Sequence, residues 1–226
     1  MQLYIAVFDF EGMLVDPQPA ADYISKEAAR LFSENGLKIT RKDFEKELEK
    51  AINSTDSAAA DARSYHAKLF SRLHIPISLL GSYERICEKS YSHYSMVEQN
   101  ERIALQKVKR LGFYMAVLTN TMHSHSDIEA ILRQTGLDGI FDMVFVPSET
   151  GYAKPDIGAY RAVLDYYKAE PENAVFIASQ KYEIDGAKLA GMLTVSYGTK
   201  FKSSDYAVQN FQGLMELLRS IKRQHQ

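Results

Sequence analysis

The chain has 226 residues and a formal net charge of −2, from 27 basic and 29 acidic side chains. At about 150 residues per domain, this length suits one or two domains. The hydrophobic fraction of 46% and the charged fraction of 25% are ordinary for a folded globular protein and exclude collagen-like and disordered classes. Because the charge is balanced and forms no basic stripe, we expect no nucleic-acid partner.

The N-terminal segment predicts neither export nor insertion into a membrane. Its apolar run starts at Leu3, ends at Asp9 and follows no basic region, so it is too short for a signal or a span. Cys87 is the only cysteine of the sequence, which excludes an internal disulfide and suits a reducing compartment. We therefore expect a cytoplasmic protein without a membrane partner.

Apolar runs of strand character alternate with helical patterns along most of the chain. The first run spans residues 3–8, and others follow at residues 114–118, 143–146, 174–178 and 193–197. Between them, apolar residues recur three to four positions apart, as they do on one face of a helix. This alternation predicts an α/β fold with a doubly wound parallel sheet, a Rossmann-like core.

Residues 16–95 interrupt this alternation, because their apolar residues keep helical spacing throughout. The segment predicts an all-helical unit inserted after the first strand. Asp16 suits its N-cap and Pro17 its first helical position. The expected organisation is therefore a core of residues 1–15 and 96–226 with an inserted helical domain of residues 16–95.

Polar residues follow several of the predicted strands. In a doubly wound sheet, ligands bind beyond the carboxyl ends of the strands. We therefore expect Asp9, Thr119, the loop after Val146 and Ser179 to converge on one crevice.

The segment that ends the first strand, Asp-Phe-Glu-Gly-Met-Leu-Val-Asp at residues 9–16, resembles the first motif of the haloacid dehalogenase superfamily, D-x-D-G-T-L-x-D. Asp9 is the candidate nucleophile, and Glu11 can exchange a proton with the leaving group or with water. Gly12 permits a sharp turn beside the bound substrate. Met13 departs from the threonine of the motif.

Two further motifs follow in the expected order. Val-Leu-Thr-Asn at residues 117–120 resembles the second motif, which implies that Thr119 binds the anionic oxygens of the substrate and that Asn120 lines the site. Residues 148–156 are similar to the third-motif loop, S-E-x-x-G-x-x-K-P-D, which gives Lys154 the task of neutralising nucleophile and substrate.

The fourth motif keeps the family frame at residues 176–192 but alters its acids. Ser179 stands where phosphatases place the carboxylate that directly holds Mg²⁺, and Glu183 stands where they place a second aspartate. Asp9, the Glu11 carbonyl and Glu183 remain as the expected Mg²⁺ ligands. The metal-free L-2-haloacid dehalogenase branch carries a serine at the position of Ser179, but its first motif lacks the second acid.

This resemblance implies a hydrolase with an aspartyl intermediate on Asp9, most simply a Mg²⁺-dependent phosphatase for a small phosphomonoester. Two alternatives stay open: a metal-free 2-haloacid dehalogenase, and a catalytically lapsed member that binds a phosphorylated ligand or a protein.

The inserted unit falls where the superfamily places its cap domain, which selects substrate. The candidate cap residues are not ranked by the sequence: Arg41, Arg63, Tyr65 and His66. His123 and His125 do not suggest a metal site, since residues two apart do not share a helical face.

Overall fold

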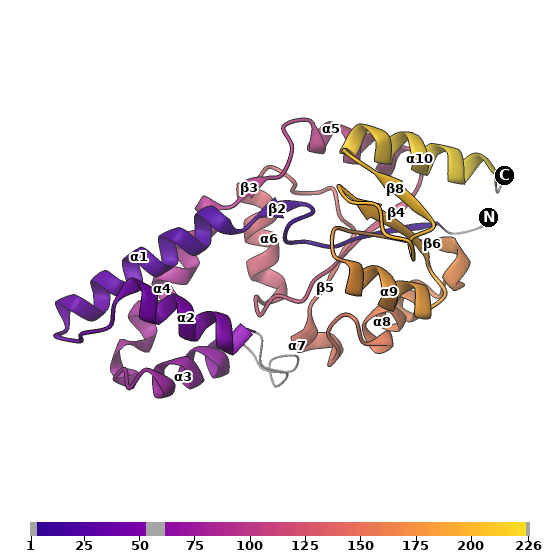
Figure 1. Cartoon of the computed structure of the whole chain (residues 1–226). Coiled ribbons are helices and arrows are strands. Elements are labelled where there is room, and N and C mark those ends of the chain that lie inside the picture. Colours follow the sequence, from indigo (N-terminus) through magenta and orange to yellow (C-terminus); the bar gives the residue numbers. More distant parts are fainter. Residues whose placement is uncertain (1–3, 53–61, 225–226) are drawn as a thin grey trace.

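The computed structural model describes residues 4–52 and 62–224. Six strands form one sheet in the order β5-β4-β1-β6-β7-β8, and every neighbouring pair is parallel (Figure 1). Strand order reverses beside β1, so the end of β1 lies at the switch point where such sheets bind ligands. The predicted α/β, doubly wound, Rossmann-like fold is confirmed. The strands are β1 (Ile5–Phe8), β4 (Tyr114–Leu118), β5 (Met143–Phe145), β6 (Ala174–Ala178), β7 (Leu193–Tyr197) and β8 (Tyr206–Val208).

Side chains of β1 alternate between two apolar layers. Ile5 and Val7 face one layer, and Ala6 and Phe8 face the other. Because both faces are covered by helices, this strand is apolar throughout, as a central parallel strand must be. Figure 1 shows α5 and α10 on one face of the sheet and α8 and α9 on the other. The helices that pack on the sheet are α5 (Glu101–Arg110), α6 (His125–Gln134), α8 (Ile157–Tyr167), α9 (Lys181–Leu189) and α10 (Phe211–Gln224).

Four of the described helices between β1 and β4 form a separate group, here called the helical unit. A short antiparallel ribbon of β2 (Val15–Asp16) and β3 (Ser95–Met96) closes its base. The rings of Phe32, Phe44, Phe70 and Tyr83 are buried in its own core. In Figure 1 the unit stands beside the sheet and does not cover either face. It contains α1 (Gln18–Glu34), α2 (Arg41–Ile52), α3 (Ala62–Arg72) and α4 (Leu80–Ser90), with the 3₁₀ turns η2 (Ile77–Leu79) and η3 (Tyr91–His93).

The start of the helical unit differs slightly from the prediction. Helix α1 begins at Gln18 with Pro17 as its N-cap residue. Asp16 was expected as the N-cap, but it pairs with Ser95 in the ribbon instead. Its Oδ1 still accepts a hydrogen bond from the Gln18 N–H at 3.0 Å. Asp16 therefore lies outside the helix but provides an acceptor for one of the N–H groups that the first turn leaves without a helical partner.

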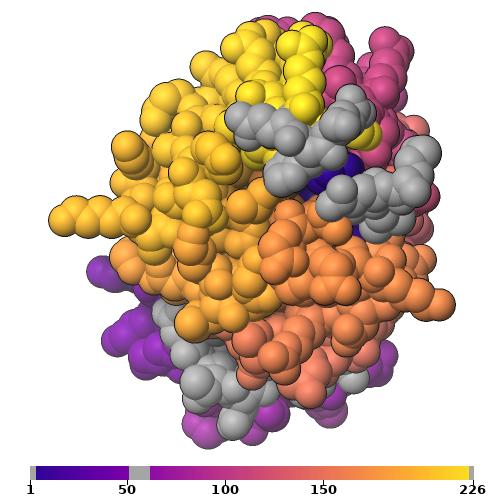
Figure 2. All heavy atoms as spheres, turned by 90° about the vertical axis from the view of Figure 1, so that its right-hand side faces the viewer, coloured from indigo at the N-terminus to yellow at the C-terminus, as the bar shows by residue number. Residues whose placement is uncertain are grey.

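Two short elements complete the core, α7 (Pro147–Thr150) and η4 (Pro171–Asn173). The C-terminal half of the chain forms most of the face seen in Figure 2, with the helical unit visible only along its lower edge. Among the described residues, no helix combines the length and the apolar character that crossing a bilayer requires.

Candidate active site

A cavity of about 590 Å³ lies between the strand ends and the helical unit. Asp9 and Glu11 line it from the end of β1, Thr119 from the end of β4, and Glu183 from the start of α9. The opposite wall comes from helices α1 to α4. The expected convergence at the carboxyl edge of the sheet therefore occurs for Asp9 and Thr119. It also occurs for the loop after Val146, whose Lys154 is bonded to Asp9, and for Ser179, whose hydroxyl lies beside the turn at Gly12.

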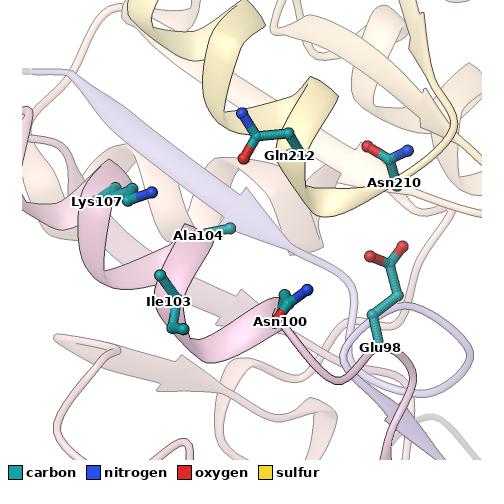
Figure 3. Close-up of a pocket in the computed structure, with 7 residues that line it drawn as sticks. All are labelled: Glu98, Asn100, Ile103, Ala104, Lys107, Asn210 and Gln212. Carbon is teal, nitrogen blue, oxygen red and sulfur yellow. The ribbon is translucent and has the colours of Figure 1, made fainter.

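A second hollow, of about 450 Å³, lies between α5 and the start of α10 (Figure 3). Glu98 is the one carboxylate among its lining residues, and its oxygens accept hydrogen bonds from the Tyr197 hydroxyl and the Phe211 N–H. This hollow brings together no nucleophile and base, so the cavity beside Asp9 is the candidate active site.

Lys154 joins two carboxylates at the floor of the site. Its ammonium donates to Asp9 Oδ1 and lies 2.9 Å from Glu183 Oε1. The Lys154 side chain is wholly buried, and its Nζ is 5.6 Å from the centre of the Phe176 ring. The structure thus brings together three of the predicted site residues, from the end of β1, the loop before α8 and the first turn of α9.

The site holds more negative than positive charge. Burial raises the pKa of Glu11 to about 7, and the neighbouring Asp9 carboxylate adds to the shift. Burial also raises the pKa of Glu183, although Lys154 opposes the change. Burial alone would lower the pKa of Lys154, but Asp9 and Glu183 together raise it above its ordinary value. Lys154 therefore stays cationic, and one ammonium balances three carboxyl groups.

Glu11 is linked to the helical unit through Tyr94. The Tyr94 hydroxyl donates to Glu11 Oε1 at 3.4 Å and lies 3.1 Å from Nε2 of His123. A hydroxyl has one proton, so when Tyr94 donates to Glu11 the His123 Nε2–H must be the donor to Tyr94. Burial lowers the pKa of His123, so the donor in this arrangement is a neutral ring with its proton on Nε2. The sequence did not indicate Tyr94 or this task for His123.

Asn120 holds the backbone of the loop that carries Lys154. Its Oδ1 accepts from the Lys154 N–H at 2.7 Å, and its Nδ2 donates to the Lys154 carbonyl at 2.8 Å. Asn120 also lines the cavity, as expected, beside Thr119. The Thr119 hydroxyl oxygen accepts from the Thr121 N–H at 3.0 Å, which leaves its own proton for a ligand.

Gly12 makes the turn that carries Glu11 away from the sheet. Its φ of +75° is in the left-handed region that favours glycine, and its N–H donates to the Val15 carbonyl at 2.8 Å. A Cβ at Gly12 would lie 3.6 Å from Ser179 Oγ. The first and fourth motifs therefore meet here, with a neutral hydroxyl at the contact.

The four candidate cap residues divide into two pairs. Tyr65 and His66 line the cavity. Arg41 forms ion pairs with Asp22 and Glu45 on the exposed surface, and Arg63 lies 3.5 Å from a carboxylate of Glu84. Only the aromatic pair is therefore placed to contact a ligand in this cavity.

The oxygen donors near Asp9 decide whether the residues of the site fit a metal ion. Within residues 4–52 and 62–224, no three His, Cys, Asp or Glu side chains are grouped so as to hold a metal ion on their own. Magnesium needs only one or two protein carboxylates when a substrate phosphate and waters supply the rest. Asp9 and Glu183 meet at Lys154, and Glu183 Oε2 is buried without a hydrogen-bond partner in the described part of the chain. The donor set and the excess negative charge fit a divalent cation.

Sequence comparison finds a matching family model and named relatives. A family model for haloacid dehalogenase-like hydrolases matches residues 6–198. The chain is 22% identical over 229 residues to the glyceraldehyde 3-phosphate phosphatase of Pyrococcus furiosus, covering 96% of this chain and 93% of that protein. It is 23% identical over 148 residues to the pyrophosphatase PpaX of Bacillus mycoides, covering 60% of this chain and 68% of the relative.

Solved structures share the fold over almost the whole chain. A HAD phosphatase from Thermococcus onnurineus superposes with a TM-score of 0.72 at 18% identity, covering 96% of this chain and 98% of that one. The L-2-haloacid dehalogenase of Xanthobacter autotrophicus gives 0.69 at 19% identity, with coverage of 97% and 99%. The magnesium-bound HAD-hydrolase YfnB of Bacillus subtilis gives 0.68 at 18% identity, with coverage of 96% and 99%. Because the family model spans most of its length, this chain belongs to the haloacid dehalogenase-like hydrolase family.

Proposed function

We propose that this protein is a phosphatase that hydrolyses a small phosphomonoester through a covalent intermediate on Asp9. The observation that carries the proposal is the Asp9 carboxylate, which lines the cavity and is bonded to the buried Lys154 ammonium. An aspartate that attacks an anionic phosphoryl group needs such a cation to offset the repulsion between like charges. Relatives named as a glyceraldehyde 3-phosphate phosphatase and a pyrophosphatase support the choice of a phosphate substrate.

The reaction divides into two displacements at phosphorus. Asp9 attacks first, so that its oxygen forms a bond to phosphorus while the bond to the ester oxygen breaks. Glu11 gives its proton to the leaving alkoxide, and its carboxylate then takes a proton from water. That water attacks the phosphoaspartate, which releases inorganic phosphate and restores Asp9. Glu11 suits both tasks because it lines the same cavity two residues after Asp9 and is held by Tyr94.

Two further side chains complete the phosphoryl site in this proposal. The free proton of the Thr119 hydroxyl and the Lys154 ammonium bind the oxygens of the transferring group. Asn120 acts mainly by holding the Lys154 backbone at both its N–H and its carbonyl. Gly12 makes the tight turn that follows Glu11, with a φ in the left-handed region that favours glycine.

Magnesium is the cofactor that the donor set favours. Asp9, Glu183 and the backbone carbonyl of Glu11 are the groups that would hold it, and Glu183 Oε2 has no hydrogen-bond partner among the described residues. When bound, Mg²⁺ supplies positive charge to the phosphoryl oxygens as negative charge develops on them. Since Ser179 contributes no charge, we expect weaker Mg²⁺ binding than a carboxylate at that position gives.

We also propose that residues 16–95 act as a cap that selects the leaving group. The support is the position of the helical unit, whose residues Ile24, Leu48 and Tyr65 form the cavity wall opposite Asp9. The β2–β3 ribbon is the connection between this unit and the core. Closure of such a unit excludes water from the reaction.

Metal-free dehalogenation is the second candidate, and Ser179 is the observation that favours it. A serine in this place and an L-2-haloacid dehalogenase among the structural neighbours are consistent with attack of Asp9 on carbon. Glu11 favours the phosphatase, because an acid beside the nucleophile is needed to protonate an alkoxide and is not needed to release a halide.

The proposal is tested with p-nitrophenyl phosphate and Mg²⁺, comparing wild type with Asp9→Asn. We expect kcat to fall by at least roughly a thousandfold, because loss of a nucleophile removes the covalent route. Asp138→Asn is the matched control, since its carboxylate is exposed and forms an ion pair with Arg102 away from the cavity. Full activity of Asp9→Asn would refute the assignment.

Two further measurements separate the alternatives. Halide release from 2-haloacids in the presence of a chelator, with no hydrolysis of phosphate esters, would identify the dehalogenase. Calorimetric titration of Mg²⁺ with a fluoride mimic of the phosphoryl group tests the lapsed member. Tight binding that survives in Asp9→Asn, without turnover of any ester by wild type, would identify a binding protein.

A further inference from the structure

The wall of the cavity opposite Asp9 is built from apolar and aromatic side chains. Ile24 and Leu48 contribute aliphatic surface from α1 and α2, and behind them Tyr65 and Tyr83 reach the wall from α3 and α4 with almost all of their surface buried. On the core side, further lining comes from Met122 and from the half-exposed ring of Tyr182. A ligand here meets carbon surface on two sides.

The tyrosine hydroxyls of this wall are already engaged within the protein. Tyr65 donates to the Leu48 carbonyl at 3.1 Å, and Tyr94 donates to Glu11 at 3.4 Å. Tyr91 shares a hydrogen bond with Asp127. These tyrosines therefore offer no free hydroxyl to a ligand, and a polyhydroxylated leaving group would gain no hydrogen bond from them without breaking one within the protein.

Permanently charged cations are absent from the described lining of the cavity, which contains no lysine or arginine and whose basic side chains are the imidazoles of His66 and His123. Asp127 adds a negative charge beyond those of the floor. The one ammonium of the site, Lys154, is buried and already bonded to Asp9 and Glu183. A substrate with a second anionic group away from the phosphate would bury that charge with no lysine or arginine of the lining beside it, which is costly.

We infer that the substrate is the phosphate monoester of an uncharged, ring-bearing alcohol, whose apolar body packs against Ile24, Leu48 and Tyr182. This inference rests on the proposed phosphatase function and names the class of leaving group. The cavity volume of about 590 Å³ holds a phosphoryl group and at least one ring. Aromatic groups stack on such walls by burial and by edge-to-face contact.

The test compares benzyl phosphate, 4-carboxybenzyl phosphate and glycerol 3-phosphate as Mg²⁺-supported substrates, with p-nitrophenyl phosphate as an activated reference. All three alcohols are unactivated, so kcat/KM reports contacts with the leaving group. We expect benzyl phosphate to exceed glycerol 3-phosphate by at least about tenfold, as burial of a ring predicts. We expect the added carboxylate to lower kcat/KM by at least about tenfold.

A variant with a new cation in the wall sharpens the test. Ala21 is exposed on α1 and lines the cavity, so Ala21→Arg places a guanidinium there with little cost to the helix. We expect this variant to raise kcat/KM for 4-carboxybenzyl phosphate relative to benzyl phosphate by about fivefold or more. Ser33→Arg is the control, because Ser33 is exposed on the same helix and does not line the cavity.

The outcomes separate this inference from the function on which it rests. Hydrolysis with equal or better rates for glycerol 3-phosphate or 4-carboxybenzyl phosphate would overturn the inference and leave the phosphatase intact. An unchanged preference in Ala21→Arg would also overturn it. No turnover of any ester, p-nitrophenyl phosphate included, would refute the phosphatase and the inference together.

Discussion

Glu101 allows a stability prediction whose size follows from the structure. Its side chain lies fully buried at the start of α5, where Oε2 accepts from the Glu98 N–H at 3.3 Å and Oε1 has no hydrogen-bond partner in the described part of the chain. Burial raises the pKa of Glu101 from 4.5 to about 8, although the hydrogen bond from the Glu98 backbone acts to lower it. At pH 7 the folded state therefore holds a proton that the unfolded state releases, which costs about 3 kcal/mol of stability.

Glu101→Gln removes this cost because the amide is neutral in both states. The pKa is raised on folding, so wild type is penalised increasingly as pH rises from 4.5 to 8, and the variant is not. We expect the variant to gain up to about 3 kcal/mol at pH 7 and almost nothing near pH 4.5. Chemical denaturation at several pH values measures this difference, with the exposed Glu172→Gln as control. A difference between Glu101→Gln and wild type that does not change with pH would contradict the reasoning.

Two further substitutions test how the residues around the candidate active site are packed and held in place. Gly186→Ala places a Cβ 2.7 Å from both the Pro155 carbonyl and the Tyr160 hydroxyl, so we expect it to lose about 1–3 kcal/mol in the free energy of unfolding, read by denaturant titration. Asn120→Ala removes both hydrogen bonds to the Lys154 backbone, and we expect kcat for p-nitrophenyl phosphate to fall by roughly a hundredfold, since the ammonium is no longer held in place. An Asn120→Ala enzyme with wild-type kcat would show that the loop positions Lys154 without this clamp.

The core of the fold was predictable because its signals are local. Buried parallel strands are apolar on both faces, so runs such as residues 114–118 and 174–178 stand out from the amphipathic helices between them. Once the topology is known, the residue after each strand is assigned to one edge of the sheet. Asp9 and Thr119 were therefore placed without any knowledge of side-chain contacts.

The edge strand β8 shows what such signals miss. Tyr206–Val208 is three residues long, so its pattern is too short to distinguish from a loop. Its position depends on a tertiary contact: Asp205 Oδ2 accepts from both the N–H and the hydroxyl of Thr194, each at 2.9 Å. Asp205 also pairs with Lys188. The sequence pattern of residues 198–210 does not indicate that Asp205 contacts Thr194 and Lys188.

The cavity wall was unpredictable for a related reason. Helical spacing shows that Tyr65 and Arg41 lie on helices, but the orientation of each helix toward the core depends on packing within the helical unit. The aromatic cluster of Phe32, Phe44, Phe70 and Tyr83 fixes that orientation. It directs Tyr65 to the cavity, while Arg41 remains on the surface with Asp22.

The contact between Glu11 and Tyr94 joins two segments that flank the two-residue ribbon. The ribbon is antiparallel and pairs Val15 with Met96, so its register alone does not bring these two residues together. Tyr94 belongs to the segment that returns from the helical unit, and Glu11 belongs to the segment that leaves the nucleophile. A rotation of the helical unit about this ribbon changes the distance between the Tyr94 hydroxyl and Glu11. The one hydrogen bond from Tyr94 to Glu11 would therefore couple the position of the proposed cap to the environment of the proposed acid and base.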